Sequence, residues 1–286
     1  MATRRKRRRL HTTFRRERCA PTSTEGYTCY SKKTITQLKK YWNARHTDNK
    51  ITATRPKEIW ASLRDKLQHV CNKESCWLKQ QFSKQKGDTN LLESIFAPWA
   101  PLSWTKNPNE WLNSLDILKV MKQYERKYPE FDFIGPTPID WNHHKLNGKC
   151  VWEELCKFDL KTQIKEGKTK IGIIFNLDPH NKGGSHWVAL YISIKHKKII
   201  FWDSTGDKTP AYIKKFITKV KKQGKPLNIS FTVAENNIAH QRNSTECGVY
   251  CLHFIIEMLK VDKPVLFKFR IADKTVEKFR KIYFNE

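Results

Sequence analysis

The sequence has no long apolar run, no recognisable signal peptide and no internal repeat over its 286 residues. A membrane-spanning helix needs about 20 consecutive, mainly apolar residues, so we expect no membrane span. The missing signal peptide predicts a soluble chain that is not secreted. Thiols stay reduced by default outside oxidising compartments, so we expect the eight cysteines to be free. The length permits one full domain with an extension.

The spacings common to zinc sites are missing as well. Cys71 and Cys76 are separated by four residues and Cys150 and Cys156 by five, with two histidines at 143–144 near the second pair. Neither spacing matches the usual pair with two intervening residues. Structural zinc stays open as an alternative, but we predict no metal site and no cofactor.

Acidic residues are scarce. The chain has 28 Asp and Glu against 55 Lys and Arg, for a formal net charge of +27. This excess goes far beyond what solubility needs and suggests a polyanionic setting, with nucleic acid or acidic proteins as partners. The competing interpretation is a compositional bias of the source genome, because lysine dominates the dispersed part of the charge.

Arginine, in contrast, is concentrated at the amino terminus. A block of like charge repels itself, so we predict that residues 1–27 form a disordered basic tail. Such a tail could contact nucleic acid, act as a nuclear address or be a plain solvated extension, and the pattern does not separate the three. The candidate nucleic-acid contacts are Arg4, Arg5, Lys6, Arg7, Arg8 and Arg9.

After the tail, residues 28–97 predict a helical arm. Apolar residues recur at helical spacing over residues 31–43 and 56–71, and no chemical motif lies among them. Pro98 marks a boundary, so we predict a second domain over residues 98–286.

Four residues in that domain have the chemistry of a cysteine protease. A thiol attacks only as a thiolate and needs a base, and His186 can serve Cys247 in this role. The base needs an orienting carboxylate, here Asp203, and the oxyanion needs a donor, here the side-chain amide of Gln241. A lone buried cysteine is usually a small hydrophobic residue, which is our interpretation of Cys251. Four role-matched residues on compatible elements are not explained that way.

Local strand patterns predict how the base meets its carboxylate. Residues 171–177, 186–194 and 198–203 are rich in β-branched and aromatic residues and are bounded by polar or glycine positions, so we predict strands. A tight turn joins the last two. In the resulting antiparallel hairpin, His186 is expected directly beside Asp203.

A helix predicted over residues 247–259 places the nucleophile at a helix start. The segment is apolar almost all round, which is typical of a central buried helix. We expect Ser244 or Thr245 to cap it, with Cys247 in the first turn, where the helix dipole favours a thiolate. The backbone amide of Cys247 and the side chain of Gln241 would then form the oxyanion hole.

The remaining pattern predicts helices over 109–127 and 211–223 and a strand over 228–234. Residues 129–141 contain three prolines and predict a loop, with a strand-like stretch at 131–134. Three further residues are candidates for substrate binding. Gly184 permits the close approach of a substrate backbone, and Trp187 and Trp202 could wall a narrow channel.

The segments 185–189, 201–204 and 240–250 resemble the cysteine proteases related to the SUMO-specific proteases and to adenain, the adenovirus protease. They are especially similar to the polyprotein-maturation proteases of large cytoplasmic DNA viruses, the African swine fever virus type. Residues 111–113 also resemble the entry to the catalytic domain of SUMO proteases. The resemblance covers roughly residues 100–286, and the arm resembles the viral enzymes more faintly.

The resemblance implies an α+β, papain-like fold, in which a mixed or antiparallel sheet is flanked by helices and the nucleophile starts the central helix. It implies Cys247 as nucleophile, His186 as general base, Asp203 as orienting residue and Gln241 as oxyanion donor. Enzymes of these families cut after small residues, commonly in Gly-Gly or Gly-X-Gly contexts. The implied partners are viral polyproteins with Gly-rich cleavage sites.

We therefore predict a cysteine endopeptidase that acts in virion maturation, located in the virion and the host cytoplasm, with a nuclear location as the alternative. Two rival functions stay open. One is a SUMO- or ubiquitin-like-specific protease acting on host conjugates. The other is a basic nucleic-acid-binding virion protein with an incidental protease fold, against which the intact set of four residues argues.

Overall fold

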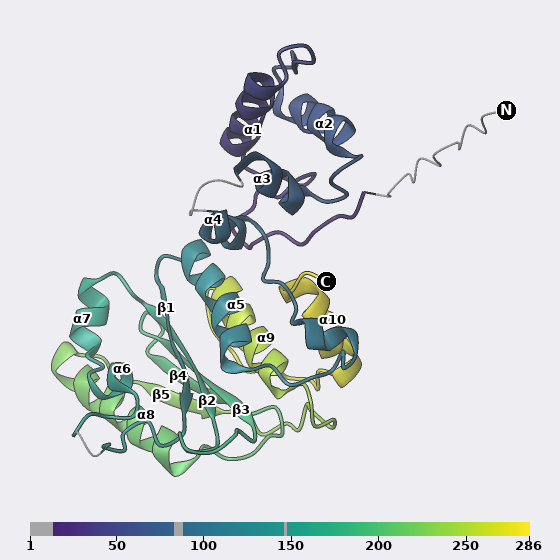
Figure 1. Ribbon diagram of the computed structural model, residues 1–286. Coiled ribbons are helices and arrows are strands. Elements are labelled where there is room, and N and C mark those ends of the chain that lie inside the picture. Colours follow the sequence, from purple (N-terminus) through teal and green to yellow (C-terminus); the bar gives the residue numbers. More distant parts are fainter. Residues whose placement is uncertain (1–13, 83–87, 146–147) are drawn as a thin grey trace. The chain divides into compact units, whose positions relative to one another are not determined.

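The computed structural model describes residues 14–82, 88–145 and 148–286, and its elements are labelled in Figure 1. The chain divides into two compact units. The arm unit runs to Ala97 and includes Asn285, and the sheet unit runs from Pro98 to Phe284 and includes Glu286.

The arm unit is helical, as predicted for its sequence. The side-chain oxygen of Ser31 caps the first helix by accepting a hydrogen bond from the amide of Thr34. The apolar faces of the helices meet in one core, which includes Ile35, Leu63 and Trp77. The helices are α1 (Lys32–Arg45), α2 (Pro56–Leu67), α3 (Glu74–Phe82) and α4 (Asp88–Ile95).

The segment before the first helix is ordered over residues 14–27. The ring of Phe14 lies 5.9 Å from the rings of both Trp60 and Trp77. Aromatic packing of this kind holds a chain segment in place despite its basic neighbours. The prediction of a disordered tail over residues 1–27 is therefore wrong for its second half.

A five-stranded sheet organises the other unit, with its strands in the order β1-β2-β3-β4-β5. β1 pairs with β2, and β4 with β5, in parallel, while the two inner pairings are antiparallel. This mixed sheet, with helices on both faces, confirms the predicted α+β class. The strands are β1 (Phe131–Pro138), β2 (Lys170–Asn176), β3 (Trp187–Ser193), β4 (Lys198–Trp202) and β5 (Thr232–Glu235).

The loop predicted over residues 129–141 is wrong, because β1 occupies most of it. Pro136 and Pro138 belong to this strand. β1 lies at the edge of the sheet, where one side of the backbone has no partner strand and a missing N–H group costs little. Prolines alone therefore misled the prediction here.

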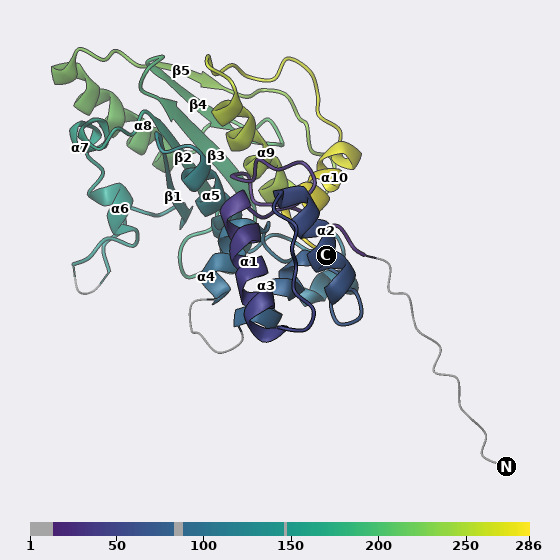
Figure 2. The same ribbon diagram turned by 90° about the horizontal axis from the view of Figure 1, so that it is seen from above.

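Alternating side chains of the central strand β3 face two different layers. Trp187, Ala189 and Tyr191 belong to one core cluster with α9 (Cys247–Lys260). The residues between them belong to a second cluster with α8 (Ala211–Gly224). Figure 2 shows α8 and α9 on opposite sides of the sheet.

Further helices complete each layer. The layer of α9 also contains α5 (Ser114–Lys127) and α10 (Asp273–Tyr283), and the layer of α8 contains α6 (Glu153–Cys156) and α7 (Leu160–Lys165). α6, α7 and α10 were not predicted, and neither were the short 3-10 turns η1 (Leu102–Thr105) and η2 (Lys225–Leu227). In the part of the chain that the structure describes, no helix has the length and apolar content needed to cross a bilayer.

Candidate active site

The β3–β4 hairpin brings His186 and Asp203 together. The Nε2 atom of His186 lies 2.8 Å from the Oδ1 atom of Asp203. The register differs from the expected one, because Ala189 pairs with Trp202, which by extension sets Asp203 opposite Val188. This shift of two residues preserves the face of the sheet, since side chains alternate with a period of two. The two side chains therefore meet diagonally.

The carboxylate of Asp203 is buried and held by its neighbours. Its Oδ1 atom also accepts hydrogen bonds from the amide and the hydroxyl of Thr205, at 2.9 Å and 2.8 Å. Only 3% of the Asp203 side chain is exposed. A carboxylate fixed in this way orients the imidazole and stabilises its protonated form.

The environment of His186 favours the imidazolium. Burial lowers its pKa, but hydrogen bonds and charge from Asp203 and Cys247 outweigh burial and raise the pKa to about 10. With Nε2 facing the carboxylate, the other ring nitrogen, Nδ1, is not engaged by Asp203. A neighbouring imidazolium in turn favours the thiolate form of a cysteine.

Cys247 is the first residue of α9 and is a free thiol. The residue at the cap position is Glu246, which makes no capping bond through its side chain, so the prediction that Ser244 or Thr245 caps the helix is wrong. The free amides of the first turn therefore remain available to an anion. Cys251, one turn further, is fully buried, and burial raises the pKa of its thiol well above the ordinary value. It is an inert core residue, as expected.

Gln241 is fixed on the segment that leads into α9. Its Oε1 atom accepts a hydrogen bond from the Ser204 hydroxyl at 2.7 Å, and its backbone amide donates to the Ser204 carbonyl at 2.8 Å. Its Nε2 group donates to the carbonyl of Asn243, which uses one of its two N–H bonds. The other N–H bond is available for an oxyanion. Ser204 follows Asp203 directly, so one turn holds both the predicted orienting carboxylate and the predicted oxyanion donor.

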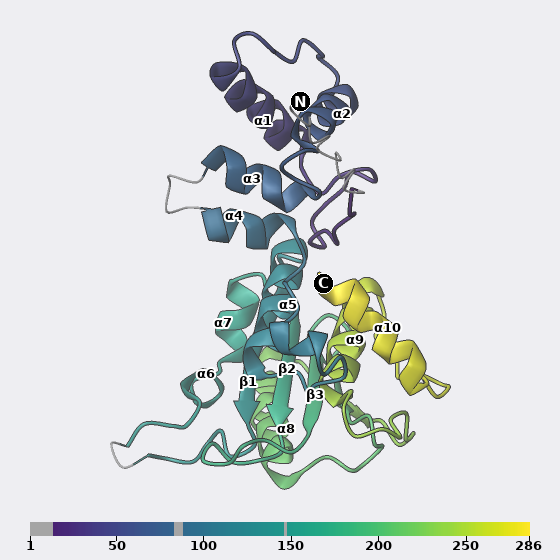
Figure 3. The same cartoon turned by 45° about the vertical axis from the view of Figure 1, so that its right-hand side comes forward.

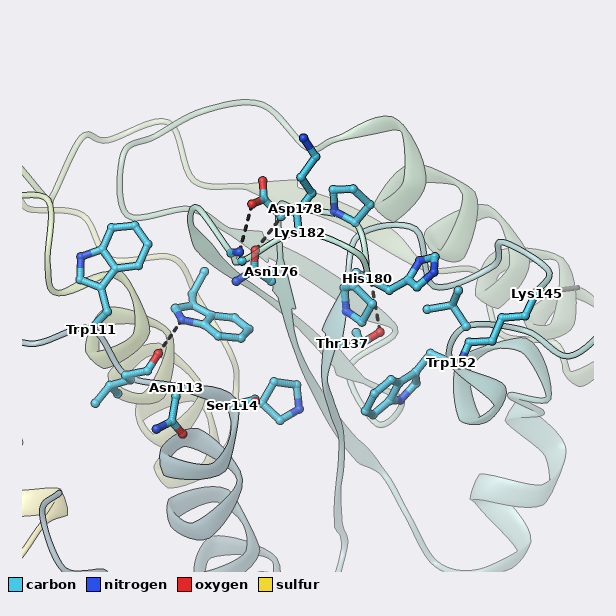
Figure 4. Close-up of a pocket in the computed structure, with 18 residues that line it drawn as sticks. Trp111, Asn113, Ser114, Thr137, Lys145, Trp152, Asn176, Asp178, His180 and Lys182 are labelled. Atoms are coloured by element: carbon cyan, nitrogen blue, oxygen red, sulfur yellow. Dashed lines mark hydrogen bonds between the residues drawn. The ribbon is translucent and has the colours of Figure 1, made fainter.

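A cleft of about 570 Å³ opens at the start of β3, which follows His186. Trp111 and Asn113 lie at one end, and Trp152 and His180 at the other (Figure 4). Trp187 also lines the cleft, and its indole N–H donates to the carbonyl of Leu112 at 2.9 Å. The loop residues at the far end were missed, because no periodic signal in the sequence marks them.

Gly184 lines the same cleft, and its role in substrate binding stays a prediction. Its backbone has a φ of +98°, a conformation that side chains disfavour. A Cβ atom built there would lie 2.7 Å from the Nδ2 atom of Asn176. Any other residue would therefore be strained at this position.

Trp202 does not line the cleft, so its prediction as a substrate-binding residue is wrong. Its side chain is fully buried and stacks on Phe254 of α9, with ring centroids 5.0 Å apart. The ring of His240 lies 4.5 Å away on the same side of the sheet. Because successive strand residues alternate, the side chain of Trp202 points into the α9 layer.

Six of the cysteines form disulfides, so the expectation of free thiols is wrong for them. The pairs are Cys19–Cys29, Cys71–Cys76 and Cys150–Cys156. Each pair closes a short loop, in which the chain brings the two sulfurs together locally. The cysteines weighed as zinc ligands are thus bonded to each other. Among the described residues no group of three or more His, Cys, Asp or Glu side chains could hold a metal ion. The candidate nucleic-acid contacts at residues 4–9 lie outside the described residues.

Comparisons with known proteins agree with this geometry. The model of the Ulp1 protease family, C-terminal catalytic domain, matches residues 121–286. A cysteine protease of African swine fever virus is 27% identical over 256 residues, which cover 83% of this chain and 92% of that protein. A protein of Acanthamoeba polyphaga mimivirus, provisionally named a thiol protease, is 27% identical over 82% of this chain and 81% of its own.

The fold is also that of a solved viral protein. The crystal structure of an African swine fever virus protease matches with a TM-score of 0.65 and 25% identity, covering 94% of this chain and 95% of that one.

Proposed function

The chain belongs to the Ulp1 protease family of cysteine proteases, and we propose that it is a virion-maturation endopeptidase in which Cys247, His186, Asp203 and Gln241 perform the chemistry. The observation that carries this assignment is the 2.8 Å contact of Asp203 with His186, together with the free thiol of Cys247 at the start of a buried helix and its effect on the pKa of His186. Nucleophile, base and orienting carboxylate stand in the order that thiol catalysis needs.

In the acylation step, the Cys247 thiolate attacks the carbonyl carbon of the scissile bond. The carbonyl oxygen becomes an oxyanion, which the backbone amide of Cys247 and the Nε2 group of Gln241 stabilise. The tetrahedral intermediate then collapses to a thioester. The imidazolium of His186 gives its proton to the leaving amine, and Asp203 holds the ring in place during the transfer.

In the deacylation step, neutral His186 removes a proton from water. The hydroxide equivalent attacks the thioester carbonyl, and the same two donors stabilise the second oxyanion. Collapse releases the new carboxylic acid and returns the thiolate–imidazolium pair. The imidazolium that Asp203 stabilises is thus both the acid of the first step and the product of the second.

We propose viral polyproteins with Gly-containing cleavage sites as substrates, processed in the virion and the host cytoplasm. Trp111 and Trp187 border the cleft beside Gly184, and a crowded entrance favours residues without bulky side chains. The naming of similar African swine fever and mimivirus proteins as proteases supports a viral setting.

A second candidate is a SUMO-specific protease acting on host conjugates. It is favoured by the family match and by a relative from another African swine fever virus isolate, which bears the name SUMO-1 cysteine protease. Recombinant protein should be incubated in parallel with the structural polyprotein of the virus and with SUMO conjugates. We expect the polyprotein to be cut. Cleavage of SUMO conjugates alone would favour the second candidate.

The experiment that tests the chemistry itself uses a peptide vinyl sulfone ending in Gly-Gly. We expect the reagent to form a thioether with Cys247, which mass spectrometry of digested protein would locate. Sequencing the amino termini of processed virion proteins then identifies the natural sites. A protein that leaves the reagent and all peptides untouched would favour the third hypothesis, a nucleic-acid-binding virion protein.

A further inference from the structure

Helix α10 contacts the short segment that carries the proposed oxyanion donor and leads to the nucleophile. We call residues 241–246 the catalytic loop. Asp273, Glu277 and Arg280 stand at positions i, i+4 and i+7 of α10, so they share one face of the helix. All three touch the catalytic loop. Figure 3 shows α10 alongside α9, at whose start the loop ends.

Asp273 holds the beginning of the catalytic loop. Its carboxylate accepts from the backbone amide of Arg242 at 3.2 Å and 3.3 Å, through its two oxygens. It also accepts from the hydroxyl of Tyr250 in α9 at 3.1 Å and from the Arg270 side chain at 3.1 Å. Arg242 adjoins Gln241, so this buried carboxylate fixes the backbone from which the amide side chain of Gln241 projects.

Arg280 holds the other end of the catalytic loop. Its Nε atom donates to both carboxylate oxygens of Glu246, at 2.8 Å and 3.1 Å. A terminal nitrogen donates to the carbonyl of Glu110 at 2.6 Å, and the guanidinium lies 4.5 Å from the ring centroid of Trp104. Glu246 is fully buried and stands at the cap position of α9, directly before Cys247. The planar guanidinium admits few alternative geometries, so it sets the position of the first helical turn.

The spacing of Asp273 and Arg280 along α10 lets this one helix hold both ends of the catalytic loop. Asp273 and Arg280 are separated by about 10 Å along the helix axis, since an α-helix rises about 1.5 Å per residue. Between them the Glu277 carboxylate accepts from the Asn243 side chain at 3.4 Å. Buried ion pairs contribute little net stability compared with well-packed apolar residues, so stability alone does not account for charged residues here. They do restrict the backbone to one arrangement.

We propose that α10 is a positioning element for catalysis, in which Asp273 sets the orientation of Gln241 and Arg280, through Glu246, sets the place of Cys247. The inference rests on the proposed function of those two residues. It assigns separate effects to the two ends: one end acts on the oxyanion and the other on the nucleophile.

The two effects can be separated by two reactions of the same thiol. Peptide cleavage builds an oxyanion. Alkylation by iodoacetamide does not, since the thiolate displaces iodide at a saturated carbon. Asp273→Asn should lower kcat for a Gly-containing peptide by about ten-fold, the scale of a small misplacement of a catalytic group, with KM and the alkylation rate unchanged. Arg280→Lys should slow both cleavage and alkylation. Lys278→Ala, on the exposed face of α10, is the matched control and should change neither.

A double-mutant cycle supplies the decisive measurement. If Asp273 acts through Gln241, then Asp273→Asn should change kcat by less than about two-fold in a Gln241→Ala background, because effects of residues that act as a unit do not add. Multiplicative losses would overturn the inference for Asp273. Losses of kcat that only match the loss of folded protein, measured by circular dichroism, would overturn it for both residues.

Failure of the proposed function would give results different from those that overturn the inference about α10. Wild-type protein that cuts no peptide, or a Gln241→Ala variant with full activity, would remove the oxyanion role itself. The alkylation rates of wild type, Arg280→Lys and Lys278→Ala would still decide the Arg280 half. Equal rates in all three would overturn it, and a slower rate in Arg280→Lys alone would support it.

Discussion

Both units of the protein bury carboxylates, and they use them for different ends. In the arm unit, Glu17 accepts from the amide of Ser75 at 2.6 Å, and Glu74 accepts from the amide of Cys29 at 3.0 Å. Burial raises the pKa of Glu17, against the lowering effect of the Ser75 bonds. Their partners all belong to the arm unit, where the carboxylates join turns and helices that the small apolar core alone would hold weakly.

In the sheet unit, three of the buried carboxylates lie next to residues of the proposed active site, whereas Asp116 belongs to the capping box of α5. Asp203 contacts His186, Asp273 contacts the amide after Gln241, and Glu246 directly precedes Cys247. Burial and hydrogen bonds from neighbouring groups are therefore common to both units. The neighbouring nucleophile and base, and not the state of the carboxylate, distinguish a catalytic carboxylate from a structural one.

The cysteines show the same division. Two of the three disulfides, Cys19–Cys29 and Cys71–Cys76, lie in the arm unit, while both free cysteines lie in α9 of the sheet unit. A unit without a sheet buries less apolar surface per residue and gains more from cross-links. The sheet unit has apolar layers on both faces and keeps its free thiols inside one of them.

The largest expected effect separates chemistry from folding within the sheet unit. Cys247→Ala should abolish peptide cleavage while the melting temperature stays close to that of the wild type, because Ala occupies the same buried place. His186→Ala should be about as damaging, roughly 10⁶-fold in kcat, since the members of such a unit act together. Cys251→Ala is the matched control and should retain activity. Substantial turnover by the Cys247 variant would make Cys251 the next candidate.

Loss of the oxyanion donor comes next. Gln241→Ala should lower kcat by roughly 100- to 1000-fold, with little change in KM, because its amide acts only when the oxyanion forms. Steady-state kinetics on one fluorogenic peptide measure both constants. A variant with a normal kcat and a raised KM would contradict this role and move Gln241 into substrate binding.

A milder effect is expected for Asp203→Asn, which keeps a hydrogen-bond acceptor for the imidazole. Wild-type activity should fall as the pH rises through about 10, where His186 loses the proton that it gives to the leaving amine. The variant should show this fall at lower pH, because Asp203 provides the largest of the effects that raise the pKa of His186. Identical alkaline limbs in the two pH profiles would remove Asp203 from the orienting role.

The same pKa shift affects stability with a definite sign. The folded protein holds the His186 proton up to a higher pH than the unfolded chain, whose reference pKa is 6.5. The resulting stabilisation is complete below that value and is lost as the pH rises through about 10. Unfolding free energies of wild type and His186→Gln should therefore converge across this range.

The disulfides of the two units should differ in their effects, one on substrate binding and the other on stability. Val151 and Trp152, which line the cleft, lie inside the loop closed by Cys150–Cys156. Changing that pair to serine should raise KM by about five-fold, the equivalent of about 1 kcal/mol of weaker substrate binding, with kcat unchanged. The same change at Cys71–Cys76 should instead cost about 2–3 kcal/mol of arm stability and leave KM alone. Equal KM values for the two double variants would contradict this division.

The smallest effect on cleavage concerns the basic residues that precede the described chain. Removing residues 1–13 should leave peptide cleavage intact and weaken binding to duplex DNA. The log–log salt dependence of binding should flatten by about 0.9 for each phosphate that the shortened chain no longer neutralises. The deletion stops at residue 13 because Phe14 packs in the arm core. Equal salt slopes before and after truncation would mean that the basic run is a nuclear address or an idle extension.

Much of the site was predictable because its geometry is local. Runs of β-branched and aromatic residues identified β3 and β4, and the short turn between them brought His186 near Asp203 even though the register was two residues off. The apolar run after Glu246 identified α9 as central, with Cys247 at its start. Such patterns reflect contacts between residues near each other in the chain, which a sequence displays directly.

The misjudged features depend on contacts between distant residues. Trp202 looked like a channel wall, but its place opposite Phe254 buries it. Glu246 stands at the cap position in place of the expected residues, and its carboxylate is held by Arg280 of α10. No local pattern carries this information, since the partners are separated by dozens of residues and meet only after the layers pack.

The sequence by itself therefore determined the reaction type: a thiol, an imidazole, a carboxylate and an amide in a fixed order on elements whose periodicity is visible. Only the tertiary structure decided which tryptophan faces the cleft and that α10 holds both ends of the catalytic loop. The physical reason is that chemical identity belongs to single residues, whereas exposure, pairing and orientation are properties of packed surfaces that form after distant segments meet.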